Sequence, residues 1–112
     1  MAEYNLARIA VSGVPYAADK LYTYLIPEAL RETLRPGMRV TVPFGRGNRR
    51  SEGFVMDALS GEVLPGYKPI DSALDEAPLM QEEFLKLIKW MKARYFCTYY
   101  DAIKAVLPGG IW

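Results

Sequence analysis

The sequence has 112 residues, 51% of them hydrophobic, with a formal net charge of +1, no histidine and one cysteine. This length and composition fit one compact domain with a small apolar core. The lone Cys97 excludes a disulfide within the chain, and the lack of histidine nearly excludes a Cys/His zinc site. No stretch approaches the roughly 18 apolar residues of a membrane helix. Residues 1–5 show no secretory signal, so we expect a cytoplasmic protein without a membrane partner.

Residues 1–74 are predicted to form a β unit. Met38, Val40 and Val42 alternate with polar residues, which is the period-2 pattern of a half-buried strand. Several other segments are rich in β-branched and aromatic residues, which favour strands. A proline followed by an acidic residue predicts a short helix over 27–34. Strands are expected at residues 4–11, 21–26, 38–42, 51–59 and 67–72.

Residues 75–112 are predicted to form a helical appendage. A helix over 79–95 places six apolar side chains on one face, which we expect to pack on the core. Thr98 is a good N-cap for a second helix over 102–107, and residues 108–110 are expected to end it. The six apolar side chains are those of Met80, Phe84, Leu87, Ile88, Met91 and Tyr95.

These elements predict an α+β fold for residues 1–112 as a single domain. The expected architecture is a small curled, mostly antiparallel β-sheet or open barrel of about five strands, with a short inserted helix and two C-terminal helices. The sequence ends on the apolar pair Ile111 and Trp112 directly after helix-breaking residues. We therefore expect the chain to be a fragment of a longer protein.

Positive charge gathers in residues 31–50, which hold six arginines and one glutamate. The net charge of this stretch is +5 (6 − 1), so the rest of the chain carries −4 (1 − 5). A loop hinged at Gly45 and Gly47 can bring guanidinium groups close to a phosphate backbone. The alternative is a solvated loop whose charge only maintains solubility. The candidate phosphate-binding residues are Arg39, Arg46, Arg49 and Arg50.

Tyr22 and Tyr24 lie two residues apart in an expected strand, so they project from the same face. They could form a stacking platform for a base. The alternative is that they are core or barrel-rim residues with solvated hydroxyl groups. The usual catalytic groups are missing, because histidine is absent and nothing marks Cys97 as activated. We therefore expect a binding domain, with no catalytic residue and no metal site.

Three segments resemble the N-terminal domain of the PriA family, the bacterial replication-restart DNA helicases also called primosomal protein N′. These segments are 21–28 (LYTYLIPE), 35–45 (RPGMRVTVPFG) and 52–55 (EGFV). The resemblance covers nearly the whole chain, including the expected helix at 79–95 and the AVLP sequence at 105–108. It implies a DNA-binding domain that recognises the free 3′ end of a nascent strand at a stalled replication fork.

The resemblance also implies a pocket that accepts the terminal nucleotide. The family's aromatic–acid–tyrosine triplet falls on Tyr22, Thr23 and Tyr24, its glycine on Gly45 and its lysine on Lys68. Thr23 is a departure, because the family more often has aspartate there. A threonine hydroxyl can form a hydrogen bond but offers no charged carboxylate.

The resemblance further implies what lies outside this chain. No cofactor is expected here, whereas ATP, magnesium and zinc belong to the remainder of the ATP-dependent 3′→5′ helicase. The expected partners are DNA, the remaining helicase domains, single-stranded-DNA-binding protein and other primosome proteins, in the cytoplasm at the nucleoid. Two alternatives stay open. One is a general OB-like or SH3-like module for single-stranded DNA or RNA, and the other is a protein-interaction domain whose arginine loop contacts an acidic partner.

Overall fold

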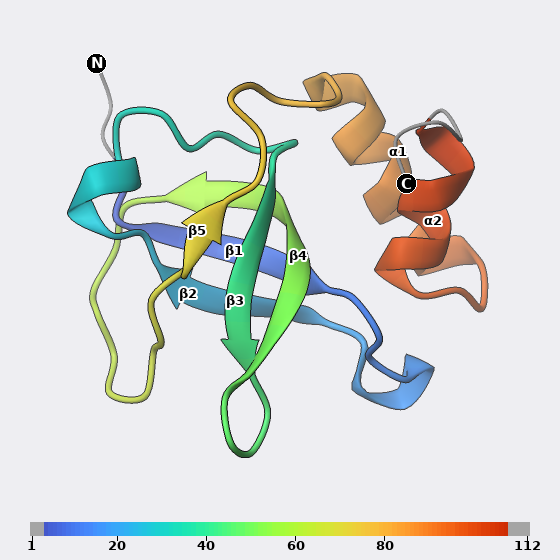
Figure 1. The fold of residues 1–112 in the computed structure, drawn as a ribbon. Helices are drawn as coiled ribbons and strands as arrows, with labels where there is room; N and C mark the ends of the chain where they lie inside the picture. The colour runs from blue at the N-terminus through green and yellow to red at the C-terminus, as the bar shows by residue number, and fades with distance from the viewer. Residues whose placement is uncertain (1–3, 108–112) are drawn as a thin grey trace.

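The computed structural model describes residues 4–107 and shows a five-stranded antiparallel sheet beside two helices (Figure 1). The strands are β1 (Leu6–Val11), β2 (Leu21–Leu25), β3 (Arg39–Phe44), β4 (Arg49–Leu59) and β5 (Ser72–Ala73). The helices are α1 (Glu82–Arg94) and α2 (Tyr99–Val106), and two short 3₁₀ turns are η1 (Tyr16–Ala18) and η2 (Glu28–Leu30). The predicted α+β fold with a curled antiparallel sheet is confirmed.

The sheet has the strand order β2-β1-β4-β3-β5 and bends strongly around the long strand β4. A register shift between Arg8 and Ile9 in the β1–β4 pairing adds to this bend. β1 and β4 approach closely at Gly53, where a Cβ atom would lie 2.4 Å from the Ile9 side chain. A glycine is therefore required at this position of β4.

The segment just before β5 links the two edges of the curled sheet. The Leu25 amide on the β2 edge donates to the Lys68 carbonyl at 2.9 Å, and the Ile70 amide donates back to Leu25 at 3.0 Å. The chain then enters β5, which pairs with β3 on the opposite edge. The sheet is not closed by a continuous ladder, but this crossing segment brings β2 near the β3–β4 hairpin.

Two apolar cores lie on opposite faces of the sheet. Ile9 and Val55 face the core enclosed by the curl, together with Tyr24. Their neighbours Ala10 and Phe54 point the other way, into a core shared with the two helices. Successive strand residues point to opposite faces, so β1 and β4 are apolar on both. The helices cover one face of the sheet, to the right of the strands in Figure 1.

Two predicted elements are shorter than expected. The helix predicted at 27–34 is wrong, because only the 3₁₀ turn η2 forms before the chain turns into β3. The strand predicted at 67–72 is reduced to β5, since Pro69 cannot extend a ladder and forms only an isolated bridge with Leu25.

The predicted apolar face of the first long helix is partly wrong. Met80 precedes α1, which begins after the N-cap residue Gln81, so Met80 does not set the phase of the helix. Leu85 and Ile88 are the buried residues of α1, whereas Leu87 is 40% exposed. Phe84 and Tyr95, also expected on the buried face, are likewise exposed.

The N-cap of the second helix is the one that the sequence predicts. Thr98 is the N-cap of α2, and a capping box joins its side chain to Asp101. The helix starts at Tyr99, three residues earlier than predicted. The predicted helix stop at 108–110 lies outside the described residues. Within residues 4–107, no helix is long and apolar enough to cross a bilayer.

Candidate functional site

A cavity of about 500 Å³ opens between β2, the end of β3 and the segment before β5. All five residues predicted for the nucleotide pocket line it, although they come from three separate stretches of chain. The curl of the sheet brings these stretches together, because the crossing segment pairs with the β2 edge beside the hairpin. The lining residues are Lys20, Leu21, Tyr22, Thr23, Tyr24, Phe44, Gly45, Gly66, Tyr67 and Lys68.

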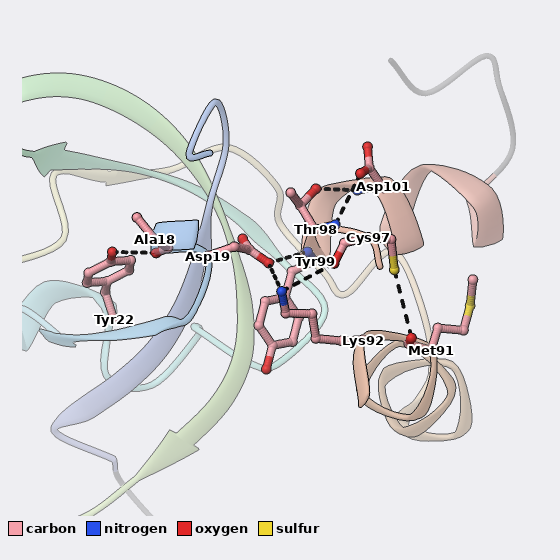
Figure 2. A network of polar contacts seen from close by, with 9 residues as sticks. All are labelled: Ala18, Asp19, Tyr22, Met91, Lys92, Cys97, Thr98, Tyr99 and Asp101. Atoms are coloured by element: carbon pink, nitrogen blue, oxygen red, sulfur yellow. Dashed lines mark hydrogen bonds and ion pairs between the residues drawn. The ribbon is translucent and has the colours of Figure 1, made fainter. Parts of the chain in front are cut away.

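Tyr22 presents a half-buried ring whose orientation is fixed on several sides. Its hydroxyl donates to the Ala18 carbonyl at 2.7 Å (Figure 2). Its ring meets Phe44 edge-on with 5.0 Å between ring centroids, and the Lys20 ammonium lies 5.2 Å from its centroid. Aromatic and cation–π contacts of this kind hold a ring in one orientation.

Tyr24 contributes to the same cavity from the core side. It is only 4% exposed, and its hydroxyl donates to the Pro43 carbonyl at 2.7 Å. Burial, helped by the neighbouring Tyr22, raises the pKa of Tyr24 to about 12. Tyr24 therefore forms a neutral wall of the cavity, whereas Tyr22 is the more accessible ring.

Gly45 and Lys68 meet at the mouth of the cavity. The Lys68 ammonium lies 3.4 Å from the Gly45 carbonyl, a long and weak hydrogen bond. Gly45 has φ +74°, and a Cβ there would meet no heavy atom within 4 Å. Glycine is favoured here because it adopts the positive φ of the turn, and the space next to its Cα atom is open. Thr23 also lines the cavity and is half-exposed.

The β3–β4 hairpin carries three of the four candidate phosphate ligands. Arg46 and Arg49 are exposed, and so is Arg50, whose side chain is 74% exposed. Arg50 Nε lies 2.8 Å from Asp71 Oδ2, next to a smaller hollow of about 200 Å³. An exposed ion pair of this kind is weak, so the guanidinium remains able to exchange partners.

Arg39, the fourth candidate, is not brought to this site. It lies at the opposite end of β3, roughly 16 Å from the hairpin at the usual rise per strand residue. Its guanidinium contacts both carboxylate oxygens of Asp75, at 2.8 and 3.2 Å, and its backbone amide donates to Asp75 at 2.8 Å. Burial alone would raise the pKa of Asp75, but the Arg39 hydrogen bonds outweigh it and lower that pKa. This pair ties residue 75 to the sheet.

Five lining residues were not among the predicted site residues: Lys20, Leu21, Phe44, Gly66 and Tyr67. Phe44 lies in the Pro-Phe-Gly kink, and its place before Gly45 was the available signal. Lys20 and Tyr67 are direct neighbours of a predicted strand or site residue, which is a weaker signal. Within residues 4–107, no three His, Cys, Asp or Glu side chains gather to form a metal site.

The sequence of the chain is similar to those of known proteins. A family model described as the 3′DNA-binding domain (3′BD) of PriA matches residues 9–108. The chain is 31% identical over 109 residues to the replication restart protein PriA of Bacillus subtilis, which covers 96% of this chain and 13% of that protein. It is 31% identical over 96 residues to the PriA of Treponema pallidum, covering 80% of this chain and 14% of that protein.

A similar relation holds for the probable replication restart protein PriA of Mycobacterium tuberculosis. That protein is 29% identical over 97 residues, which is 86% of this chain and 14% of the relative. The chain thus spans about one seventh of the length of these curated relatives.

Proposed function

The chain belongs to the family of PriA 3′DNA-binding domains, and from this premise we propose that its cavity receives the last nucleotide at the free 3′ end of a DNA strand. One observation carries the proposal. Tyr22, Thr23, Tyr24, Gly45 and Lys68 come from three segments and line one open cavity.

Each wall of the cavity has a chemical role in this proposal. The accessible ring of Tyr22 stacks on or flanks the terminal base, a contact of about 1–3 kcal/mol. The open space above Gly45 admits the sugar close to the backbone. The Lys68 ammonium exchanges its weak contact with the Gly45 carbonyl for a phosphate oxygen. None of these contacts reads a base sequence, so recognition depends on the strand end.

The hairpin arginines hold the phosphates that precede the terminal nucleotide. Arg46, Arg49 and Arg50 extend from the loop beside the cavity, where they can follow the strand away from its end. Phosphate contacts of this type release counterions, so binding weakens as salt rises. The basic loop and the cavity then act as one continuous interface.

In the longer protein, we propose that this domain targets a replication-restart helicase to stalled forks. The relatives carry the name replication restart protein PriA. The remainder of such a protein would bind ATP, magnesium and zinc and would supply the helicase activity. The protein would act in the cytoplasm, at the nucleoid. Its other domains, single-stranded-DNA-binding protein and further primosome proteins would be its partners besides DNA.

A titration by fluorescence anisotropy tests the end-binding role. It compares single strands that carry a 3′-hydroxyl, a 3′-phosphate or an all-RNA backbone. We expect the 3′-phosphate to weaken binding, because the added charged group must fit beside the end of the cavity. Equal affinity for all three strands would instead indicate a general single-strand binding module. No binding at moderate salt would favour an acidic protein partner.

Position 23 holds threonine where the family more often has aspartate, and this residue determines how strongly we expect a 3′-phosphate to weaken binding. A threonine hydroxyl can accept a hydrogen bond from the terminal 3′-hydroxyl, but it does not repel a phosphate as a carboxylate does. We therefore expect weaker discrimination between the two ends than an aspartate would give. The variant Thr23→Asp in the same titration separates the contribution of this position from that of the rest of the cavity.

A further inference from the structure

Among residues 4–107, neither α1 nor α2 contributes a residue that lines the cavity. A series of polar contacts nevertheless connects these helices to the cavity. Figure 2 shows this series, which runs from Lys92 on α1 through Asp19 to the turn beside Tyr22. The two charged side chains that join these regions, Lys92 and Asp19, are only 16% and 3% exposed, which is unusual for an ion pair on a small domain.

Asp19 is the central residue of this network. Its side chain is only 3% exposed and lies 2.8 Å from the Lys92 ammonium. The same carboxylate oxygen accepts a hydrogen bond from the Tyr99 amide at 2.8 Å, at the first residue of α2. A carboxylate at a helix N-terminus satisfies a free amide and complements the helix dipole. Asp19 therefore binds both helices at once.

Lys92 has further contacts besides its ion pair with Asp19. Its side chain is 16% exposed, and its ammonium also donates to the Cys97 carbonyl at 3.2 Å. The ammonium lies 4.4 Å from the centroid of the Tyr16 ring in η1. Burial lowers the pKa of Lys92, but the hydrogen bond and charge of Asp19 outweigh it and raise that pKa. Lys92 therefore stays charged and clamps both ends of the η1 turn.

The clamped turn carries the hydrogen-bond acceptor of Tyr22. Ala18 lies between Tyr16 and Asp19, two residues at this turn that Lys92 contacts, and its carbonyl accepts a hydrogen bond from the Tyr22 hydroxyl. Lys20, the next residue after Asp19, places its ammonium near the Tyr22 ring. The position of the η1 turn thus fixes the Tyr22 hydroxyl and also places Lys20 beside the Tyr22 ring, which lines the cavity.

We infer that Asp19 and Lys92 are positioning residues for the DNA-end cavity: they hold the η1 turn so that Ala18 orients the Tyr22 ring. This inference rests on the proposed function for its effect on DNA binding. Neither side chain lines the cavity, so both act through Tyr22. Loss of either charge leaves the other in a largely shielded position without its ion-pair partner, which releases the turn.

The test uses the 112-residue chain with Lys92→Met, which keeps the aliphatic stem and removes the ammonium. The orientation of Tyr22 is followed by fluorine NMR after incorporation of 3-fluorotyrosine at the eight tyrosines, with Tyr22→Phe to assign its signal. We expect the Tyr22 signal to shift or broaden. Affinity for strands with a free 3′ end should fall roughly 2- to 30-fold, the range for coupling through neighbouring residues.

Lys89→Met is the matched control. Lys89 is also a lysine of α1 in an ion pair, 2.7 Å from Asp57, and its replacement changes the net charge equally. It should leave both the Tyr22 signal and the affinity unchanged. Lys92→Arg should restore both, since a guanidinium can still reach Asp19. In the double variant Tyr22→Phe/Lys92→Met, the affinity losses should not add, because both act through one hydroxyl.

An unchanged Tyr22 signal in folded Lys92→Met overturns the inference. If thermal unfolding shows that this variant is not folded, Asp19→Asn decides the question instead, since its amide oxygen can still accept from Tyr99. The fluorine measurement needs no DNA. A wild-type chain that shows no preference for 3′ ends therefore contradicts the proposed function, while the Tyr22 signal still decides the positioning role.

Discussion

Tyr22 and Tyr24 of β2 have different roles at the cavity. Tyr22 and Tyr24 project from the same face of β2, as alternation requires, but they lie at different depths. Tyr24 is 4% exposed and belongs to the core, whereas Tyr22 is only partly buried and packs against that core. The sequence pattern gives the shared face but not the depth, because depth depends on how far the sheet curls.

At this scale we expect Tyr22→Ala to lower the affinity for DNA ends by about 10-fold or more, because a stacked base is worth about 1–3 kcal/mol. The fold should persist, since the ring is half-exposed. Anisotropy titration with a 3′-ended single strand measures the decrease, and circular dichroism checks the fold.

Tyr95→Ala provides the comparison for this change. Tyr95 is an exposed tyrosine at the end of α1, outside the cavity. Its removal should leave the affinity unchanged. Equal affinities for Tyr22→Ala and Tyr95→Ala would exclude a stacking role for Tyr22.

At the scale of elements, the two ends of β3 serve different purposes. The Arg39 end is tied to Asp75, and the other end carries the basic hairpin. The folded pKa of Asp75 is lowered from its ordinary value of 3.8, so the folded state favours the charged carboxylate. The resulting stability is present above the unfolded pKa and is lost as pH falls through the folded pKa.

We therefore expect Asp75→Asn to reduce the free energy of unfolding at pH 7 by about 1.5–3 kcal/mol, the range for hydrogen bonds to charged groups. The deficit relative to wild type should begin to shrink as pH falls below about 4, where the carboxylate of the unfolded chain takes up a proton, and should disappear as pH falls through the lower folded pKa. Urea denaturation between pH 7 and pH 3 measures both values. Asp57→Asn, which breaks the exposed pair with Lys89, should show a much smaller deficit.

We expect the hairpin at the end of β3 to determine how strongly the affinity for DNA depends on salt. Replacing Arg46, Arg49 and Arg50 with alanine should flatten the slope of log affinity against log salt by about one unit for each phosphate that the loop no longer neutralises. Titrations at several salt concentrations give this slope. A second triple variant removes the same charge from exposed helical positions, Lys86, Arg94 and Lys104. Equal slopes for the two triple variants would remove the hairpin from the interface.

The elements also show what a sequence can and cannot reveal. The strand alternation and the capping box are local patterns, so β3 and the N-cap of α2 were predictable. Arg39 was grouped with the hairpin arginines because linear charge counting ignores the length of the strand between them. The predicted apolar face of α1 differs from the observed one because Met80 lies in a bend before the helix, and only tertiary packing reveals that.

For the molecule as a whole, the sheet is the wall shared by two cores. Residues on one face of β1 and β4 pack inside the curl, and those on the other pack against α1 and α2. The cavity lies between β2 and the β3–β4 hairpin, and among residues 4–107 both the Asp19 network and the packing of Leu21 connect it to the helices. This arrangement predicts that residues 1–74 and 75–112 unfold as one cooperative unit, as expected for a small domain with shared packing.

Ile88→Ala tests this cooperativity. Ile88 is fully buried between α1 and the sheet, so its truncation should lower the free energy of unfolding by about 2–5 kcal/mol. Native-state hydrogen exchange should show the most protected amides of β1 and α2 losing protection to the same extent, because neither unit retains its core alone. Leu87→Ala changes the adjacent, 40% exposed residue and should cost only about 0.5 kcal/mol. A decrease in protection confined to the helices would mean that the β unit is stable by itself.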